Sequence, residues 1–161
     1  MSRFSSKQRG FTLVELLVVV AILAVLASIG MPLAELAVQR GKEEDLRRAL
    51  REIRSALDGY KRLSDDGRIQ RTVGASGYPS TLRDLVDGVP DVKSPAGAKL
   101  YFLRRLPRDP MEADPSINAE DTWALRSYDS PPGDPKPGRD VFDVHSKSKR
   151  TAIDGSFYLS W

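Results

Sequence analysis

Three patterns of apolar and polar positions follow one another along the first 63 residues. A ten-residue segment that is mostly polar and basic comes first, then an apolar run, then a charged segment with regularly spaced leucines. From Phe11 to Ala34 only Glu15 carries a charge, and this run, at about 1.5 Å per helical residue, covers the roughly 30 Å hydrocarbon thickness of a bilayer. The sequence therefore predicts a transmembrane helix over residues 11–34.

The helix is expected to continue beyond the apolar run as an amphipathic helix over residues 35–63. One apolar stripe recurs there at intervals of four and three, formed by Leu46, Leu50, Ile53, Leu57 and Tyr60. Charged residues cover much of the other surface, as on a solvated face. Pro32 removes one backbone donor, so we expect it to kink or loosen this helix rather than end it.

After residue 63 the composition changes to loops and short elements. Residues 78–89 predict a turn and a short helix that starts near Pro79 to Thr81. Seven of the eleven prolines fall between residues 107 and 137, which indicates irregular chain. Short strands are predicted in residues 122–129, 140–146 and 156–161. The expected fold class is α+β: one long N-terminal helix packed on a small antiparallel sheet, with a loop-rich C-terminal region over residues 64–161.

Charge and composition narrow the function classes. Arg3, Lys7 and Arg9 lie in the first ten residues, which contain no acid, so this segment accounts for the whole formal charge of +3. The remaining chain is neutral, which argues against a nucleic-acid partner because phosphate binding needs a positive face. The sequence has no cysteine and one histidine, His145, so disulfides are absent and a histidine-based catalytic or metal site is not expected.

The short basic segment before the apolar run predicts the topology. Positive charge in front of a span keeps that end in the cytoplasm, so the rest of the chain should lie across the membrane. The alternative is an ordinary secretory signal peptide cleaved near Val25-Leu26-Ala27. Against it stand the length of the apolar run and Glu15 inside it. A charged residue at mid-bilayer costs on the order of 2.5–3.5 kcal/mol, so Glu15 is a candidate functional residue.

Gly10-Phe11-Thr12-Leu13-Val14-Glu15, after a basic leader, resembles the processing site of type IV prepilins and of type II secretion pseudopilins. The resemblance implies that a prepilin peptidase removes residues 1–10 by cutting after Gly10, and that Phe11 is then N-methylated. It also implies that Glu15 of one subunit pairs with the new amino group on Phe11 of the next, since two buried charges cost much less as a pair. A contact within one chain, one helical turn apart, stays open as the alternative.

The rest of the sequence is similar to the major, G-type pseudopilin of type II secretion. The matching segments are YPSTLRDLV, YFLRRLPRDPM, Trp123 with Arg126-Ser127-Tyr128, DVFDVHS and DGSFYLSW. This resemblance implies a structural, non-enzymatic subunit of a helical periplasmic filament. Its partners would be copies of itself, other pseudopilins, an inner-membrane assembly platform and the prepilin peptidase. It would be a single-pass inner-membrane protein with a periplasmic C-terminal part; a pilin of a surface type IV pilus is the alternative.

Major pseudopilins typically hold a calcium ion in a loop before the last strand. The corresponding segment here, HSKSKRTAIDGS, contains three basic residues and one acid, Asp154, with Asp140 and Asp143 upstream; Asp143 and Asp154 are the best candidates for side-chain ligands. We therefore expect no cofactor, with calcium at Asp143 and Asp154 as the alternative. An acid/base or metal set formed by Asp109, Asp114, Glu120 and Asp121 would instead indicate an enzyme, but acids among prolines are usually solvated.

Overall fold

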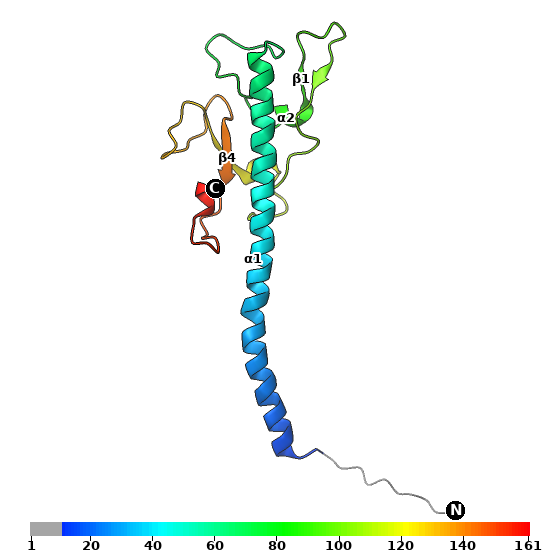
Figure 1. The fold of residues 1–161 in the computed structure, drawn as a ribbon, viewed down its shortest axis with the longest axis vertical. Helices are drawn as coiled ribbons and strands as arrows, with labels where there is room; N and C mark the ends of the chain where they lie inside the picture. The colour runs from blue at the N-terminus through cyan, green and yellow to red at the C-terminus, as the bar shows by residue number, and fades with distance from the viewer. Residues whose placement is uncertain (1–10) are drawn as a thin grey trace, which may run out of the picture. The chain divides into compact units, whose positions relative to one another are not determined.

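The computed structural model describes residues 11–161, except for the side chains of residues 29–32 (Figure 1). One helix, α1 (Leu13–Asp65), dominates the chain and starts and ends within two residues of the predicted bounds. The chain divides into two compact units, residues 1–39 and residues 40–161, and each is described separately. The predicted leader, residues 1–10, lies outside the described residues.

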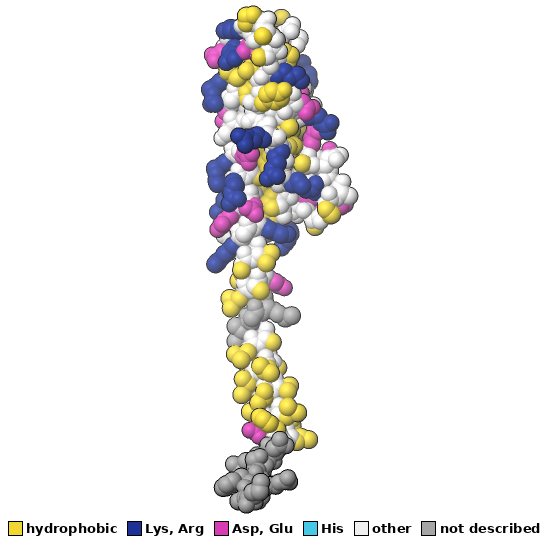
Figure 2. All heavy atoms as spheres, turned by 90° about the vertical axis from the view of Figure 1, so that its right-hand side faces the viewer, with side chains coloured by type: hydrophobic (Ala, Val, Ile, Leu, Met, Phe, Trp, Pro, Cys, Tyr) yellow, Lys and Arg dark blue, Asp and Glu magenta, His cyan; other side chains and the backbone are white. Residues whose placement is uncertain are grey.

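The first unit consists of the N-terminal part of α1. Every described side chain from residue 11 to residue 28 is exposed, although nearly all of them are apolar. Figure 2 shows hydrophobic side chains covering this part of the helix, while Lys, Arg, Asp and Glu side chains gather over residues 40–161. By length and composition, α1 can cross a membrane. The helix continues through Pro32; the kink expected there stays a prediction.

The second unit has a hydrophobic core built on one face of α1. The predicted stripe from Leu46 to Tyr60 is buried, and Ala49 and Ala56 extend it. Side chains from the rest of the chain cover this face: Ile69, Leu82, Leu85, Leu103, Trp123, Val141, Val144, Ala152 and Tyr158. The apolar face of α1 is thus covered by side chains from several later segments, which are too short to form a core among themselves.

Two small antiparallel sheets accompany α1. Strands β3 (Trp123–Arg126) and β4 (Asp143–Ser146) pair with Trp123 opposite Ser146 and Arg126 opposite Asp143. Both lie within the predicted strand segments. Strands β1 (Val89–Pro90) and β2 (Lys99–Leu100) form a second pair, which the sequence did not predict because two residues are too few to show alternation. The α+β prediction is confirmed.

The predicted short helix is shorter than expected. Helix α2 (Asp84–Asp87) begins several residues after Pro79, and the 3₁₀ turn η1 (Glu120–Thr122) leads into β3. The carbonyl of Pro79 accepts a hydrogen bond from the backbone N–H of Val141 at 2.8 Å. This long-range bond uses the carbonyl that an earlier helix start would need.

The prediction of a strand over residues 156–161 is wrong. The segment contains one isolated bridge, Thr151 to Phe157, and then the 3₁₀ turn η2 (Tyr158–Ser160). The rings of Tyr158 and Trp161 pack edge to face, 5.1 Å between centroids. Residues three apart share a side in a 3₁₀ turn but lie on opposite faces of a strand, so this aromatic contact favours the turn.

Candidate processing and assembly site

The start of α1 is capped by a side chain that sequence reasoning missed. The hydroxyl of Thr12 accepts a hydrogen bond from the backbone N–H of Glu15 at 3.2 Å, and the Thr12 carbonyl accepts one from the N–H of Leu16 at 3.1 Å. Thr12 is therefore the N-cap of the helix, with Glu15 at its third position. The signal was present in the sequence as Thr-x-x-Glu, the pattern of a capping box.

The predicted processing residues come directly before this cap in the sequence. Gly10 lies outside the described residues, and Phe11 is the residue directly before Thr12, with 77% of its surface exposed. Glu15 lies exposed in the first turn of α1, where a negative charge interacts favourably with the helix dipole. The site thus presents one carboxylate at the beginning of an exposed apolar helix surface.

The two candidate calcium ligands are engaged by different arginines. The Asp143 carboxylate accepts a hydrogen bond from Arg54 at 2.7 Å, and the Asp154 carboxylate accepts one from Arg47 at 3.2 Å. The hydroxyl and the backbone N–H of Ser156 also donate to Asp154, and together with Arg47 they lower the pKa of this carboxyl. Among the described residues, no group of three or more Asp, Glu, His or Cys side chains is arranged to hold a metal ion. Each of the two carboxylates is thus paired with a guanidinium, whose positive charge disfavours a cation beside it.

Asp109, in the element Leu-Pro-Arg-Asp-Pro at residues 106–110, is buried and has a structural role. Its carboxylate accepts hydrogen bonds from the Met111 backbone at 2.8 Å and from the Ser146 hydroxyl on β4 at 2.5 Å. Its own backbone N–H donates to the Thr122 hydroxyl at 3.1 Å. Both carboxylate oxygens therefore have partners, and the residue connects the element to the sheet.

The other acids proposed with Asp109 also have local partners. Asp114 accepts hydrogen bonds from Ser116, which lower its carboxyl pKa, and Glu120 pairs with Arg83 at 3.2 Å. Asp121 accepts from Asn118 at 3.4 Å. These are turn and surface interactions. Each of these acids has a separate partner, and the contacts do not bring them together into one acid/base site.

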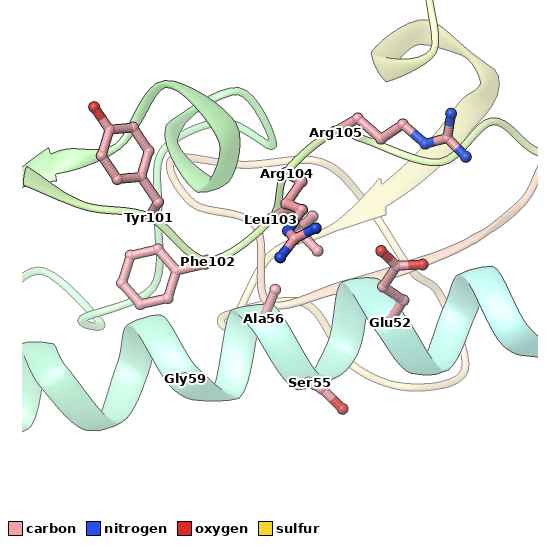
Figure 3. Close-up of a pocket in the computed structure, with 9 residues that line it drawn as sticks. All are labelled: Glu52, Ser55, Ala56, Gly59, Tyr101, Phe102, Leu103, Arg104 and Arg105. Carbon is pink, nitrogen blue, oxygen red and sulfur yellow. The ribbon is translucent and has the colours of Figure 1, made fainter.

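A groove of about 770 Å³ runs between α1 and residues 101–105 (Figure 3). Glu52, Ser55, Ala56 and Gly59 line it from the helix, and Tyr101 to Arg105 line it from the other side. Figure 3 shows Glu52 projecting from α1 toward residues 101–105, with the aromatic rings at one end of the groove and Arg105 at the other. The groove is open and lined by both signs of charge, unlike the enclosed apolar cavities that usually hold small molecules.

Comparison with known proteins places these features in a family. The family model described as the prokaryotic N-terminal methylation motif matches residues 5–31. The type II secretion system core protein G of Klebsiella michiganensis is 32% identical over 111 residues, covering 66% of this chain and 70% of that protein. The corresponding protein of Klebsiella pneumoniae is 34% identical over 112 residues, covering 67% and 72%.

The chain belongs to the type II secretion system core protein G family. It is thus a pseudopilin of the G type, and the expectation from its sequence is confirmed. The type IV major fimbrial protein FimA of Dichelobacter nodosus is also similar, 38% identical over 88 residues, covering 49% of this chain and 54% of that protein. No solved structure matches. A structural family of this kind points away from enzymatic activity, in agreement with the contacts of its acids.

Proposed function

We propose that this G-type pseudopilin is cleaved after Gly10, N-methylated at Phe11 and held in the inner membrane by residues 11–34 until it assembles into a periplasmic pseudopilus. In this proposal residues 35–63 continue the helix and residues 64–161 form the periplasmic part. The match to the methylation motif supports the processing steps, and the exposed apolar surface of α1 supports membrane anchoring followed by helix packing.

Glu15 carries the assembly proposal. Its carboxylate is exposed on an otherwise apolar helix start, so burial in a filament core would be costly without a positive partner. The amino group created on Phe11 supplies that charge. The Thr12 cap uses the backbone N–H of Glu15 and not its side chain, and this exposed side chain can reach a neighbouring subunit. Pairing between subunits would fix the axial register of helices that otherwise slide along apolar surfaces.

The processing step is tested by mass spectrometry of the mature protein isolated from membranes. A chain that begins with N-methylated Phe11 is expected. A chain that begins at Ser28, after the Val25-Leu26-Ala27 segment, would show cleavage as a secretory signal and would overturn the proposal.

The assembly step is tested with Glu15→Ala, using Glu35→Ala as the matched control. Both acids are exposed on α1, but only Glu15 lies one turn from Phe11. We expect the Glu15 variant to be inserted into the membrane and cleaved normally. It should form no pseudopili, as measured by shearing filaments from cells or by cross-linking neighbouring subunits, whereas the control variant should assemble. Normal filaments from Glu15→Ala would refute the pairing argument.

A surface type IV pilin is the second candidate, because the fimbrial relative matches about half of the chain. Deletion of the gene separates the two functions. A pseudopilin is required for export of proteins to the medium, whereas a pilin is required for surface fibres and for adhesion or motility. We expect the deletion to abolish protein export and to leave surface fibres unchanged.

The partners that we propose for this subunit, besides copies of itself, are other pseudopilins and the inner-membrane assembly platform.

A further inference from the structure

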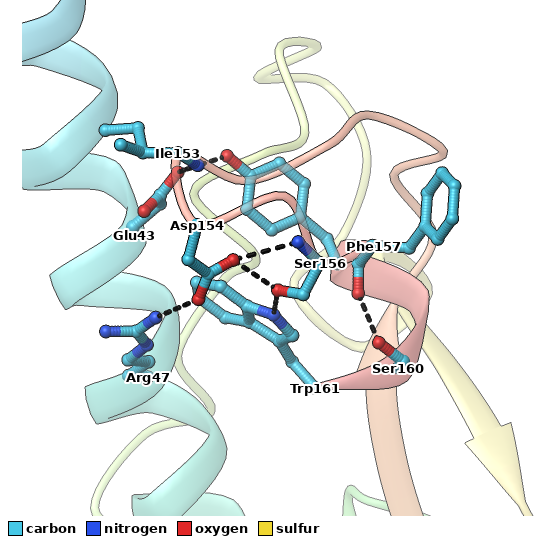
Figure 4. A network of polar contacts seen from close by, with 9 residues as sticks. Glu43, Arg47, Ile153, Asp154, Ser156, Phe157, Ser160 and Trp161 are labelled. Atoms are coloured by element: carbon cyan, nitrogen blue, oxygen red, sulfur yellow. Dashed lines mark hydrogen bonds and ion pairs between the residues drawn. The ribbon is translucent and has the colours of Figure 1, made fainter.

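The C-terminal segment, residues 151–161, is attached to α1 through a buried carboxylate. Glu43 is only 6% exposed, and its Oε1 atom accepts a hydrogen bond from the backbone N–H of Ile153 at 2.9 Å and one from the Tyr158 hydroxyl at 2.7 Å. Figure 4 shows Glu43 projecting from the helix to meet this segment. Glu43 thus accepts hydrogen bonds from a backbone N–H and a buried hydroxyl that lie more than a hundred positions later in the sequence.

A second helix residue, one turn further on, contacts the same segment. Arg47 donates a hydrogen bond to Asp154 at 3.2 Å, and its guanidinium lies over the Trp161 ring, 4.2 Å from the centroid. The Trp161 indole N–H in turn donates to the Ser156 hydroxyl at 2.7 Å, and that hydroxyl donates to Asp154 (Figure 4). These contacts join the C-terminal segment to α1 and also hold its own residues together.

Arg54, on α1, binds both strand β4 and the last residue of the C-terminal segment. Its guanidinium donates to the Asp143 carboxylate at 2.7 Å, to the Val144 carbonyl at 3.1 Å and to the backbone oxygen of Trp161 at 2.7 Å. A divalent cation could join carboxylate and backbone oxygens of this kind, but here a guanidinium with several donors does so.

We propose that Glu43, Arg47 and Arg54, here called the helix clamp, fasten the C-terminal segment of this pseudopilin to α1 without a calcium ion. Two observations carry this inference. Both acids that calcium could use are paired with clamp arginines, and the preceding loop adds the positive charges of Lys147, Lys149 and Arg150, which repel a cation. The proposal concerns the fold of one subunit and does not depend on the processing or assembly steps above.

The test uses the full-length chain in detergent, with trypsin as the probe of local opening. Lys147, Lys149 and Arg150 precede the segment, and the rate of cleavage after them reports how often it detaches. Wild type is measured in EGTA, in CaCl₂ and in MgCl₂. The variants are Glu43→Ala and Arg47→Ala. The matched control is Arg48→Ala, whose ion-pair partner is the exposed neighbour Asp45 on the same helix.

The wild-type cleavage rate and unfolding midpoint are expected to be the same in all three solutions. Glu43→Ala should raise the cleavage rate about tenfold, because a buried backbone donor and hydroxyl lose their acceptor. Arg47→Ala should raise it by a smaller factor, and Arg48→Ala should leave it unchanged. Should Glu43→Ala fail to fold, Arg47→Ala and the wild-type comparison still decide the question.

Two results would overturn the proposal. The first is a wild-type protein that is protected by calcium but not by magnesium, or that binds one equivalent of calcium in a calorimetric titration. The second is an unchanged cleavage rate in both Glu43→Ala and Arg47→Ala, which would show that these residues do not hold the segment.

Discussion

The Tyr158 hydroxyl donates a hydrogen bond to the Glu43 carboxylate at 2.7 Å, joining residues 115 positions apart in the sequence. Both side chains are buried. Removing the hydroxyl with Tyr158→Phe keeps the ring in the core but takes one donor from a buried carboxylate. We expect a loss of about 1–3 kcal/mol in the free energy of unfolding, measured by denaturant titration of the full chain in detergent.

Tyr101→Phe is the control for this substitution. Tyr101 is 65% exposed, so loss of its hydroxyl should change the free energy of unfolding by less than about 0.5 kcal/mol. Equal effects of the two substitutions would contradict a structural role for the bond between Tyr158 and Glu43.

Gly88, at the end of α2, should not tolerate a side chain. Its φ is +74° with ψ 149°, and a Cβ atom there would lie 2.7 Å from the Tyr101 ring and 3.1 Å from the Leu100 carbonyl oxygen. Gly88→Ala should therefore destabilise the protein by more than the roughly 1–3 kcal/mol that backbone strain alone costs.

Gly97→Ala is the comparison that measures the cost of a side chain at positive φ without close contacts. Gly97 has a φ of +64°, and nothing lies within 4 Å of its added Cβ. The difference in unfolding free energy between the two variants gives the added cost at Gly88 of its close contacts and of its ψ of 149°. A smaller loss at Gly88 than at Gly97 would show that the neighbouring loop yields freely.

Asp91 should make the protein acid-sensitive. Its carboxylate is held by the Arg68 guanidinium, whose hydrogen bond lowers the pKa of Asp91 below the ordinary 3.8; burial opposes this and the Lys93 backbone N–H assists it. A lowered pKa in the folded state means that this stabilisation is complete above about pH 4 and is lost as the pH falls through the folded-state pKa.

Asp91→Asn removes that contribution. Thermal unfolding between pH 7 and pH 2 should show a lower midpoint at neutral pH and a smaller decrease in acid than wild type. Asp129→Asn serves as the control, because Asp129 is a surface residue 3.7 Å from Arg139. A decrease in acid as large as that of wild type would exclude Asp91 as a source of the sensitivity.

Thr12 should define where α1 begins. Thr12→Ala removes the hydroxyl that caps the helix and is expected to cost about 1 kcal/mol at its first turn, whereas Thr12→Ser retains the cap. Amide hydrogen exchange of residues 13–16 in detergent measures this directly. Exchange should be several-fold faster in the alanine variant only; equal rates in all three proteins would contradict the cap.

Much of the fold was predictable because its signals are local. The length of α1 follows from a helical pattern that continues on both sides of Pro32, and the stripe from Leu46 to Tyr60 follows from spacing alone. The strands β3 and β4 were found because the segments that contain them, TWALRSYD and DVFDVHS, include aromatic residues and valines, which favour extended chain. The processing motif was recognised because its residue types occur at fixed spacing.

The sequence by itself thus determined the long helix, its buried face and the family to which the chain belongs. Only the tertiary structure decided how the C-terminal segment is held: it replaced the expected strand by the turn η2 and paired Asp143 and Asp154 with arginines of α1. The two arginine pairs and the hydrogen bond from Tyr158 to Glu43 join residues about ninety or more positions apart. Local patterns do not encode such contacts, because they form only when the helix and the later loops pack on one core.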